Sequence, residues 1–166
     1  DVVDTKTWKV SKQIHLTGRP NNVSVSKDGK KVYVGIAQAP GAVDVIDAVA
    51  LTNARSVKVD GSVHNVYVTP DGKFAVSGSV QTGVISVIDT KTDTLAWSLK
   101  MSAGIRPMTL DTNKDGSTRN IYVQLSNFHG IAVVDFAARK QSIRAGREAA
   151  LAQLPQLQAR IIALTR

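Results

Sequence analysis

The chain has 166 residues, of which 43% are hydrophobic and 20% charged, a composition typical of one soluble globular domain with a real core. Cysteine is absent, which excludes disulfides, thiolate metal sites and cysteine nucleophiles, and the sequence has no apolar run long enough to predict a membrane span. The net charge of +8 is concentrated after residue 138, where no aromatic residue accompanies the basic ones, so we expect no nucleic-acid partner.

The chain opens in the middle of a pattern. Residues 1–18 begin "DVVDTKTWKVSKQIHL" and predict two short strands, which is half of the unit that follows. No signal peptide is visible at this end. An upstream segment could therefore have been removed or never included.

A repeat of about 43 residues organises the chain. Asp-Gly pairs begin at Asp28, Asp71 and Asp115, with spacings of 43 and 44 residues. A second marker, two hydrophobic residues followed by Asp, recurs with spacings of 43, 42 and 46 residues and ends at Asp4, Asp47, Asp89 and Asp135. Two markers that keep one period indicate a repeat architecture. We expect the second set of aspartates to form turns.

Within each unit, apolar residues alternate with a period of two. The stretch "VSVSKDGKKVYVGIA" predicts a strand, a tight Asp-Gly turn and a second strand, and "AVDVIDAVALTNARSVKV" predicts another pair. Four short strands in about 43 residues is the unit of a β-propeller blade. The sequence thus predicts an all-β propeller with four-stranded antiparallel blades and about three blades per chain. We place a half blade at 1–18, blades at 19–62 and 63–105, and an incomplete blade at 106–140.

The stretch "RPNNVSVSKDGKKVYVGIAQAPGAVDVIDAVALTNARSVKV" resembles the YVTN-type β-propeller repeat, and "VHNVYVTPDGKFAVSGSVQTGVISVIDTKTDTLAWSLKM" matches that pattern again. The resemblance covers residues 1 to about 140. It implies the propeller fold and a bacterial periplasmic or extracellular location. It leaves function open, because such propellers serve many roles.

Three blades cannot close a ring, since closed propellers have about four to eight. Either the chain is a fragment of a longer propeller, or several copies associate to complete one ring. We favour a homo-oligomer, because head-to-tail contacts close when the rotation allows it. The segment "WKVSKQIHL" could then supply the outer strand that the last blade of a neighbouring copy lacks.

After Lys140 the alternation stops. The tail at 141–166 is rich in Ala, Leu, Gln and Arg, and its apolar residues recur every three or four positions, which predicts one or two helices interrupted at Pro155. The resemblance does not extend to this tail. We expect its apolar face to cover a blade edge or to pair with another copy.

Aligning the units on their Asp-Gly turns places Asn21, His64 and Met108 at equivalent positions just before the innermost strands. These residues should surround the mouth of the central channel. His129, in the loop between a second and a third strand, should open on the same face. Arg19 and Arg106, each beside this position, could bind an anionic ligand there. His15 should be more peripheral.

Two functions follow from this placement. The first is a binding propeller that offers its channel mouth to a small-molecule ligand or a partner protein. The second is a hydrolase in which His64 and His129, with symmetry-related copies, hold Zn²⁺ and activate water. Propellers resembling this one include lactonase-like and phosphotriesterase-like enzymes, so an ester, a lactone or a phosphoester would be the substrate. A general base is not obvious, and Asp111, aligned with Tyr67, is a weak catalytic candidate. We favour the binding role.

Overall fold

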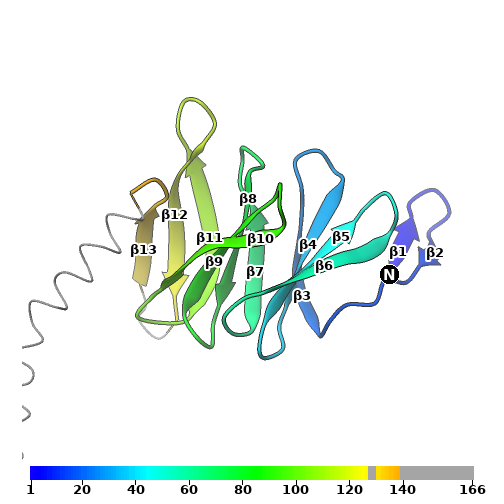
Figure 1. The fold of residues 1–166 in the computed structure, drawn as a ribbon, viewed down its shortest axis with the longest axis horizontal. Helices are drawn as coiled ribbons and strands as arrows, with labels where there is room; N and C mark the ends of the chain where they lie inside the picture. The colour runs from blue at the N-terminus through cyan, green and yellow to red at the C-terminus, as the bar shows by residue number, and fades with distance from the viewer. Residues whose placement is uncertain (127–129, 139–166) are drawn as a thin grey trace, which may run out of the picture.

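The computed structural model describes residues 1–126 and 130–138, and these residues are all β (Figure 1). They form four antiparallel sheets, two of them with four strands in simple sequential order. The first complete sheet contains β3 (Pro20–Val25), β4 (Lys31–Ile36), β5 (Ala42–Asp47) and β6 (Thr52–Lys58). The second contains β7 (Val63–Val68), β8 (Phe74–Ser79), β9 (Val84–Asp89) and β10 (Thr94–Lys100). We call these sheets the first and middle blades.

A third blade and a hairpin lie at the two ends of this arrangement. The third blade has three strands, β11 (Ile105–Thr112), β12 (Thr118–Leu125) and β13 (Gly130–Asp135). The hairpin consists of β1 (Val2–Asp4) and β2 (Lys9–Lys12), which pair with each other within the chain. The predicted all-β propeller with four-stranded antiparallel blades is thereby confirmed. The predicted helical tail at 141–166 lies outside the described residues.

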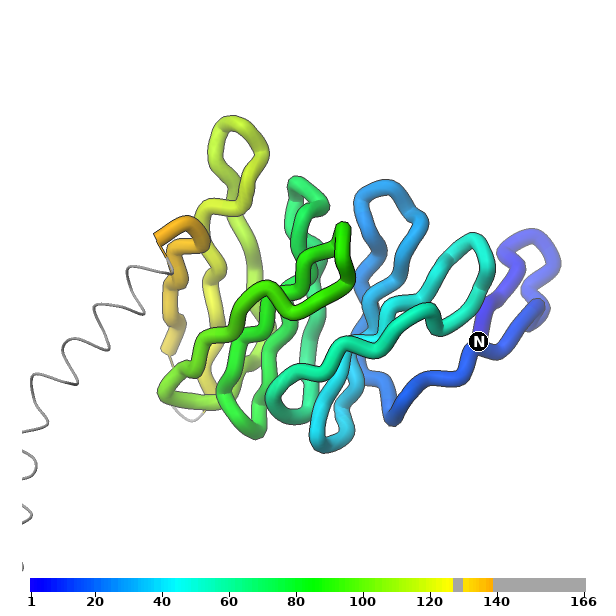
Figure 2. The backbone as a smooth tube through the Cα atoms, in the orientation of Figure 1, coloured from blue at the N-terminus to red at the C-terminus, as the bar shows by residue number. Residues whose placement is uncertain are grey.

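The Asp-Gly turns define one side of the blades. The Asp-Gly turns between first and second strands project together along one edge of Figure 2. Gly29, Gly72 and Gly116 have φ values of 72°, 76° and 82°, a conformation that favours glycine. In the first and middle blades, the loops between second and third strands lie on the opposite side. The chain therefore has an Asp-Gly face and a second face, which we call the mouth face.

The turns between third and fourth strands are fixed by the repeated aspartates. Oδ1 of Asp47 accepts hydrogen bonds of 2.8 Å from the backbone N–H groups of both Val49 and Ala50. These bonds lower the pKa of Asp47. Four residues after the aspartate the backbone is left-handed, at Trp8, Leu51 and Asp93. One turn geometry thus carries three different side chains.

The first and middle blades are joined by an apolar layer. Its buried members from both blades are Tyr33, Val43, Val45, Val57, Val63, Val66, Ala75 and Ile88. A Cβ added at Gly35 would lie 2.7 Å from a methyl group of Val63. Gly35 on β4 therefore allows β7 to approach closely, because any larger residue would push the blades apart.

Side chains of β3 also bond directly to the backbone of β7. Oδ1 of Asn22 accepts from the N–H of Val66 at 2.8 Å, and Oγ of Ser24 accepts from the N–H of Val68 at 3.0 Å. These N–H groups lie on the innermost strand of the middle blade, which has no further strand of its own sheet beside it. The first blade therefore supplies hydrogen-bond acceptors for two backbone N–H groups at the free edge of the middle blade.

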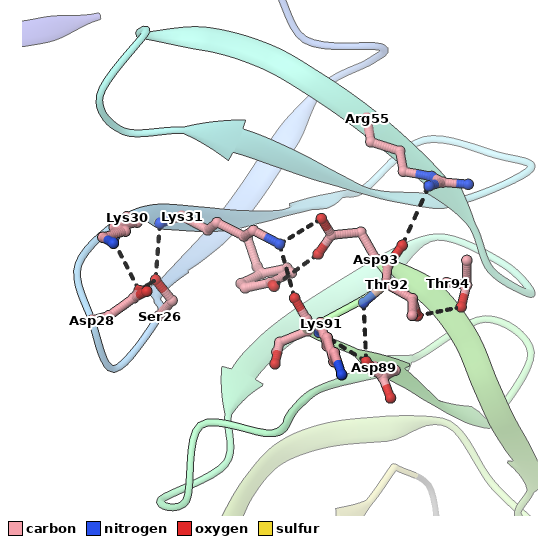
Figure 3. A network of polar contacts seen from close by, with 12 residues as sticks. Ser26, Asp28, Lys30, Lys31, Arg55, Asp89, Lys91, Thr92, Asp93 and Thr94 are labelled. Atoms are coloured by element: carbon pink, nitrogen blue, oxygen red, sulfur yellow. Dashed lines mark hydrogen bonds and ion pairs between the residues drawn. The ribbon is translucent and has the colours of Figure 1, made fainter.

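A polar network closes the same interface on the Asp-Gly face (Figure 3). The Lys31 ammonium lies 2.6 Å from Oδ2 of Asp93, and the Tyr33 hydroxyl donates to Oδ1 of Asp93 at 3.0 Å. Lys31 also donates to the Thr90 carbonyl at 2.8 Å. Burial and the nearby Asp93 carboxylate raise the pKa of Tyr33 above its usual range. Asp93, at the left-handed turn position, is thus held by two residues of the preceding blade.

The interface between the middle and third blades is aromatic and aliphatic. Its buried members include Val76, Ile85, Val87, Ile105, Met108, Ile121 and Val123. The ring of Phe136 lies 5.3 Å from that of Phe74 and 5.4 Å from that of Trp97, between ring centres. Gly78 occupies the position of Gly35, because a Cβ there would lie 2.3 Å from a methyl group of Ile105.

The outer faces of the two end blades remain open to different degrees. On the first blade, Val34, Ile36 and Ile46 are covered in part by Ile14 and Leu16 from the segment after β2. Buried Asp44 anchors that segment, accepting from the backbone N–H and the hydroxyl of Thr17, each at 2.7 Å. On the third blade, Ile131 and Val133 are 71% and 59% exposed. In the parts of the chain that the structure describes, no helix has the length and hydropathy needed to cross a membrane.

Candidate functional site

A pocket of about 370 Å³ opens on the mouth face between the first and middle blades. It is lined by the start of β3, the end of β4, the start of β7 and the loop after β8. The lining residues are Arg19, Asn21, Ala37, Ser62, Val63, His64, Val80 and Gln81. The structure therefore brings together three of the residues that the sequence predicted at the channel mouth, namely Arg19, Asn21 and His64.

Hydrogen bonds fix the polar side chains around this pocket. The Asn21 amide donates to the backbone carbonyl of His64, so a side chain of the first blade holds the mouth strand of the middle blade. The Arg19 guanidinium donates through Nη2 to the Ala37 carbonyl at 3.3 Å. The Arg19 side chain is exposed, but this bond ties it to the rim of the pocket.

The His64 imidazole is half-buried and contacts its sequence neighbour through Nδ1, which bonds to Oδ1 of Asn65. Nε2 is then the remaining polar atom of the ring. His64 can offer this one nitrogen to a ligand at the pocket.

Met108 does not lie at the channel mouth. It pairs with Val123 on β12, just as Val66 pairs with the corresponding Ser77 on β8, so its true equivalent is Val66 and not His64. Its exposed fraction is 6%, and it packs in the core between the middle and third blades. The equivalent of His64 in the third blade is Arg106, whose Nε donates to the Ser126 hydroxyl at 2.9 Å.

Asp111 is likewise displaced from the position that the sequence alignment gave it. Its Oδ1 accepts from the N–H of Asn120 at 2.8 Å, the bond that the Thr69 hydroxyl makes to the N–H of Phe74 in the middle blade. Asp111 therefore corresponds to Thr69, on the Asp-Gly face, and not to Tyr67 on the inner strand. Both misplacements arise because the third blade's first hairpin is longer than the others.

Asp111 is also a poor candidate for a general base. The Arg119 guanidinium donates to its Oδ2 through Nε at 3.1 Å and Nη2 at 2.6 Å, and the Tyr122 hydroxyl donates to the same oxygen at 3.0 Å. These bonds, led by those from Arg119, lower the pKa of Asp111 to about 2. A carboxylate with such a pKa is a weak proton acceptor at neutral pH. Asp111 instead ties the turn end of the third blade together.

Zinc chemistry would need more ligands than the described residues of one chain bring to the pocket. His129, the second predicted ligand, lies outside the described residues. Among residues 1–126 and 130–138, no three His, Asp or Glu side chains gather closely enough to hold a metal ion. A zinc centre requires at least three protein ligands, so His64 alone does not make one, and the predicted zinc site stays a prediction that depends on His129 and on further copies of the chain. We therefore derive no catalytic step through a metal.

Sequence reasoning missed two polar residues of the pocket, Ser62 and Gln81. Their side chains contact each other, with the Ser62 hydroxyl 3.4 Å from Oε1 of Gln81. Gln81 lies in the loop between the second and third strands of its blade, where His129 was selected in the next unit. Because this loop lies on the mouth face in the repeat, its position was the signal that could have identified Gln81.

Comparisons with known proteins support the fold. No protein-family model and no curated protein sequence matches the chain. Among 586 matching chains of solved structure is one titled Kuenenia stuttgartiensis hydrazine synthase, with a TM-score of 0.71 and 25% sequence identity. The match covers 82% of this chain, and this chain spans only 39% of the length of that one. A fold shared this widely does not by itself indicate a function.

Proposed function

We propose that this chain is a propeller module that associates head to tail with a second copy and binds a ligand at the mouth of the resulting channel. The observation that carries the proposal is that the two open faces of the chain match the two sides of its interior blade interfaces. In each interior interface the second and third strands of one blade pack against the following blade. The third blade presents these same strand positions with no following blade among the described residues.

The apolar residues of the two open faces correspond to those of the interior interfaces. Ile131 and Val133 on β13 match Ile85 and Val87 on β9, which are fully buried against the third blade. On the first blade, a cavity of about 450 Å³ is lined mainly by apolar side chains, including Leu16, Val23, Val32, Val34 and Ile46. A second copy could place Ile131 and Val133 against this surface and remove both apolar patches from water.

A polar contact between the first and middle blades also has its counterparts on the open faces. Thr109, which pairs with Tyr122, occupies the position of Ser24 on the first blade. Val25 on β3 occupies the position of Val68, whose N–H the Ser24 hydroxyl satisfies. In the proposed assembly, the Thr109 hydroxyl of one copy accepts from the Val25 N–H of the next.

One position of the third blade departs from this pattern. Gln124 on β12 pairs with Ile131 and occupies the place that Gly78 takes on β8. Its side chain must turn aside before Pro20 of a second copy can approach as closely as Ile105 approaches Gly78. The proposed contact is therefore looser than the interior interfaces, and Gln124→Gly should strengthen it.

The hairpin at the beginning of the chain bears on how the assembly closes. β1 corresponds to the third strand of a blade and β2 to the fourth, whereas the third blade ends on β13 among the described residues. β2 could complete a neighbouring third blade by exchanging β1 for the β13 of that copy. This pairing would remove the free edge of β13.

The test is the mass of the particle in solution, measured by light scattering and sedimentation over a range of concentrations. We expect a mass at least twice the 17.7 kDa of one chain. Val133→Asp should reduce it to one chain without lowering the melting temperature of the monomer, while Val49→Asp, at a turn residue that is 79% exposed, should leave it unchanged. A wild-type mass of 17.7 kDa at every concentration would overturn self-association. The further blades of a ring would then have to come from a different polypeptide segment.

A further inference from the structure

We propose that the mouth-face pocket binds a small organic carboxylate anchored by the Arg19 guanidinium, an inference that deepens the proposed ligand-binding function. The pocket is built entirely by the first and middle blades of one chain. It therefore exists before any assembly. Its ligand can be sought in a single copy as well as in a closed ring.

The charge of the pocket favours an anionic ligand. Among the described residues that line the pocket, Arg19 is the one permanently charged side chain, and none is an aspartate or a glutamate. None of the ion pairs among residues 1–126 and 130–138 involves Arg19. A guanidinium has five N–H donors, and the bond to the Ala37 carbonyl uses one of them. The remaining donors can form the two parallel hydrogen bonds that a carboxylate accepts.

The neutral residues of the pocket extend the polar side of the site. Asn21 is engaged with the His64 carbonyl, so it shapes the wall and is not the ligand's main partner. The Ser62 hydroxyl bonds to Oε1 of Gln81, which leaves the Gln81 amide nitrogen as a donor at the pocket. With Nδ1 bonded to Asn65, His64 presents Nε2. A ligand hydroxyl beside the carboxylate can form a hydrogen bond with that nitrogen, because a hydroxyl both donates and accepts.

Size and apolar surface distinguish an organic carboxylate from an inorganic anion. A volume of about 370 Å³ lies in the range of small-molecule sites, and far exceeds one phosphate ion. Ala37, Val63 and Val80 supply apolar walls that a short hydrocarbon body can cover. A single guanidinium balances the single charge of a carboxylate. Inorganic phosphate would leave the apolar walls in water and carry excess charge.

The test uses the Val133→Asp variant, so that binding is measured apart from self-association. Benzoate, hexanoate and sodium phosphate are titrated at constant ionic strength while the amide and imidazole NMR signals are recorded. We expect saturable shifts at His64 and Gln81 with benzoate or hexanoate, in the millimolar range. Arg19→Gln should weaken this binding by about tenfold, the loss expected for one charge-assisted pair.

Arg106→Gln is the matched control, because Arg106 is also an exposed arginine of the mouth face but does not line this pocket. Its affinity should stay within about twofold of the parent, since a distant exposed charge is largely screened by salt. Shifts that do not saturate, equal losses in the two arginine variants, or phosphate binding as tightly as the carboxylates would each overturn the inference. Those results would leave the mass measurements untouched, so failure here is distinguishable from failure of self-association.

Discussion

The two blade interfaces of this chain occupy equivalent places in the repeat but use different chemistry. Between the first and middle blades, Lys31 and Tyr33 hold the Asp93 carboxylate of the next blade. Between the middle and third blades, Phe74 occupies the place of Lys31 and packs against Phe136. Glycine on the second strand allows close approach in both interfaces. The comparison teaches that the close approach at the second-strand glycine recurs in both interfaces, while the side chains that close each interface differ in chemistry.

The largest effect should come from breaking the aromatic interface. Phe136 is 6% exposed and packs against two aromatic rings. Phe136→Ala should lower the free energy of unfolding by about 3–5 kcal/mol, because it removes buried surface and leaves a cavity. Urea unfolding followed by circular dichroism measures this loss. Val49→Ala, at a residue that is 79% exposed, is the control and should change stability by less than about 0.5 kcal/mol.

The polar interface should be less sensitive. Asp93→Asn keeps a residue that tolerates the left-handed backbone but removes the charge that faces Lys31, whose side chain is 32% exposed. We expect a loss of about 1–2 kcal/mol, between the values for exposed and buried ion pairs. The control is Lys73→Ala. The Lys73 side chain is 71% exposed and its Nζ lies 3.9 Å from Oδ2 of Asp71, so this variant removes an ion pair at the surface. If Asp93→Asn were as stable as the parent, the polar contacts would add nothing to the apolar layer beneath them.

The smallest effect concerns the turn of the third blade, where a carboxylate replaces the hydroxyl of the other blades. The pKa of Asp111 is about 2 in the folded chain, below the value of about 3.9 for an unfolded aspartate. Ionised Asp111 therefore stabilises the fold above about pH 4, and this contribution is lost as the pH falls from about 4 to 2. The difference in urea midpoint between wild type and Asp111→Asn should shrink over that interval.

A difference in midpoint that stays constant from pH 6 to pH 2 would show that Asp111 acts through its shape and not through its charge. Asp60→Asn, at an exposed aspartate before β7, provides the control and should show little difference at any pH. Ser26 and Thr69 make the corresponding bonds with hydroxyl groups, which do not titrate. The acid sensitivity of this particular hydrogen bond should therefore belong to the third blade alone.

The repeat was readable from the sequence because two markers keep a common period, and the strands of the first two blades follow from it. The alignment was wrong for Met108 and Asp111, since it assumed hairpins of equal length. The third hairpin is longer, so residues on its two sides shift in opposite directions relative to the turn. The pairing of Met108 with Val123 is a matter of register, and the Asp-Gly motif does not fix register.

The site was partly predictable for the same reason. Arg19 precedes β3, and Asn21 and His64 are the second residues of β3 and β7, so their common face follows from the repeat. The closing contact between Tyr33 and Asp93 did not follow, because it joins residues 60 positions apart in different blades. Gln81 was not predicted because a glutamine carries no signature of metal or catalytic chemistry. The position of its loop in the repeat indicates the pocket regardless of residue type.

The left-handed turn residue described above has a consequence for how such a chain can change. Trp8, Leu51 and Asp93 share one backbone conformation, so the turn accepts an indole, an aliphatic chain or a carboxylate without rebuilding. In the middle blade that residue touches the preceding blade. A substitution at this turn position can therefore change the contact between two blades while the strands on either side stay as they are. After a blade is duplicated in the gene, the two copies can come to differ at this position without any change in their strands.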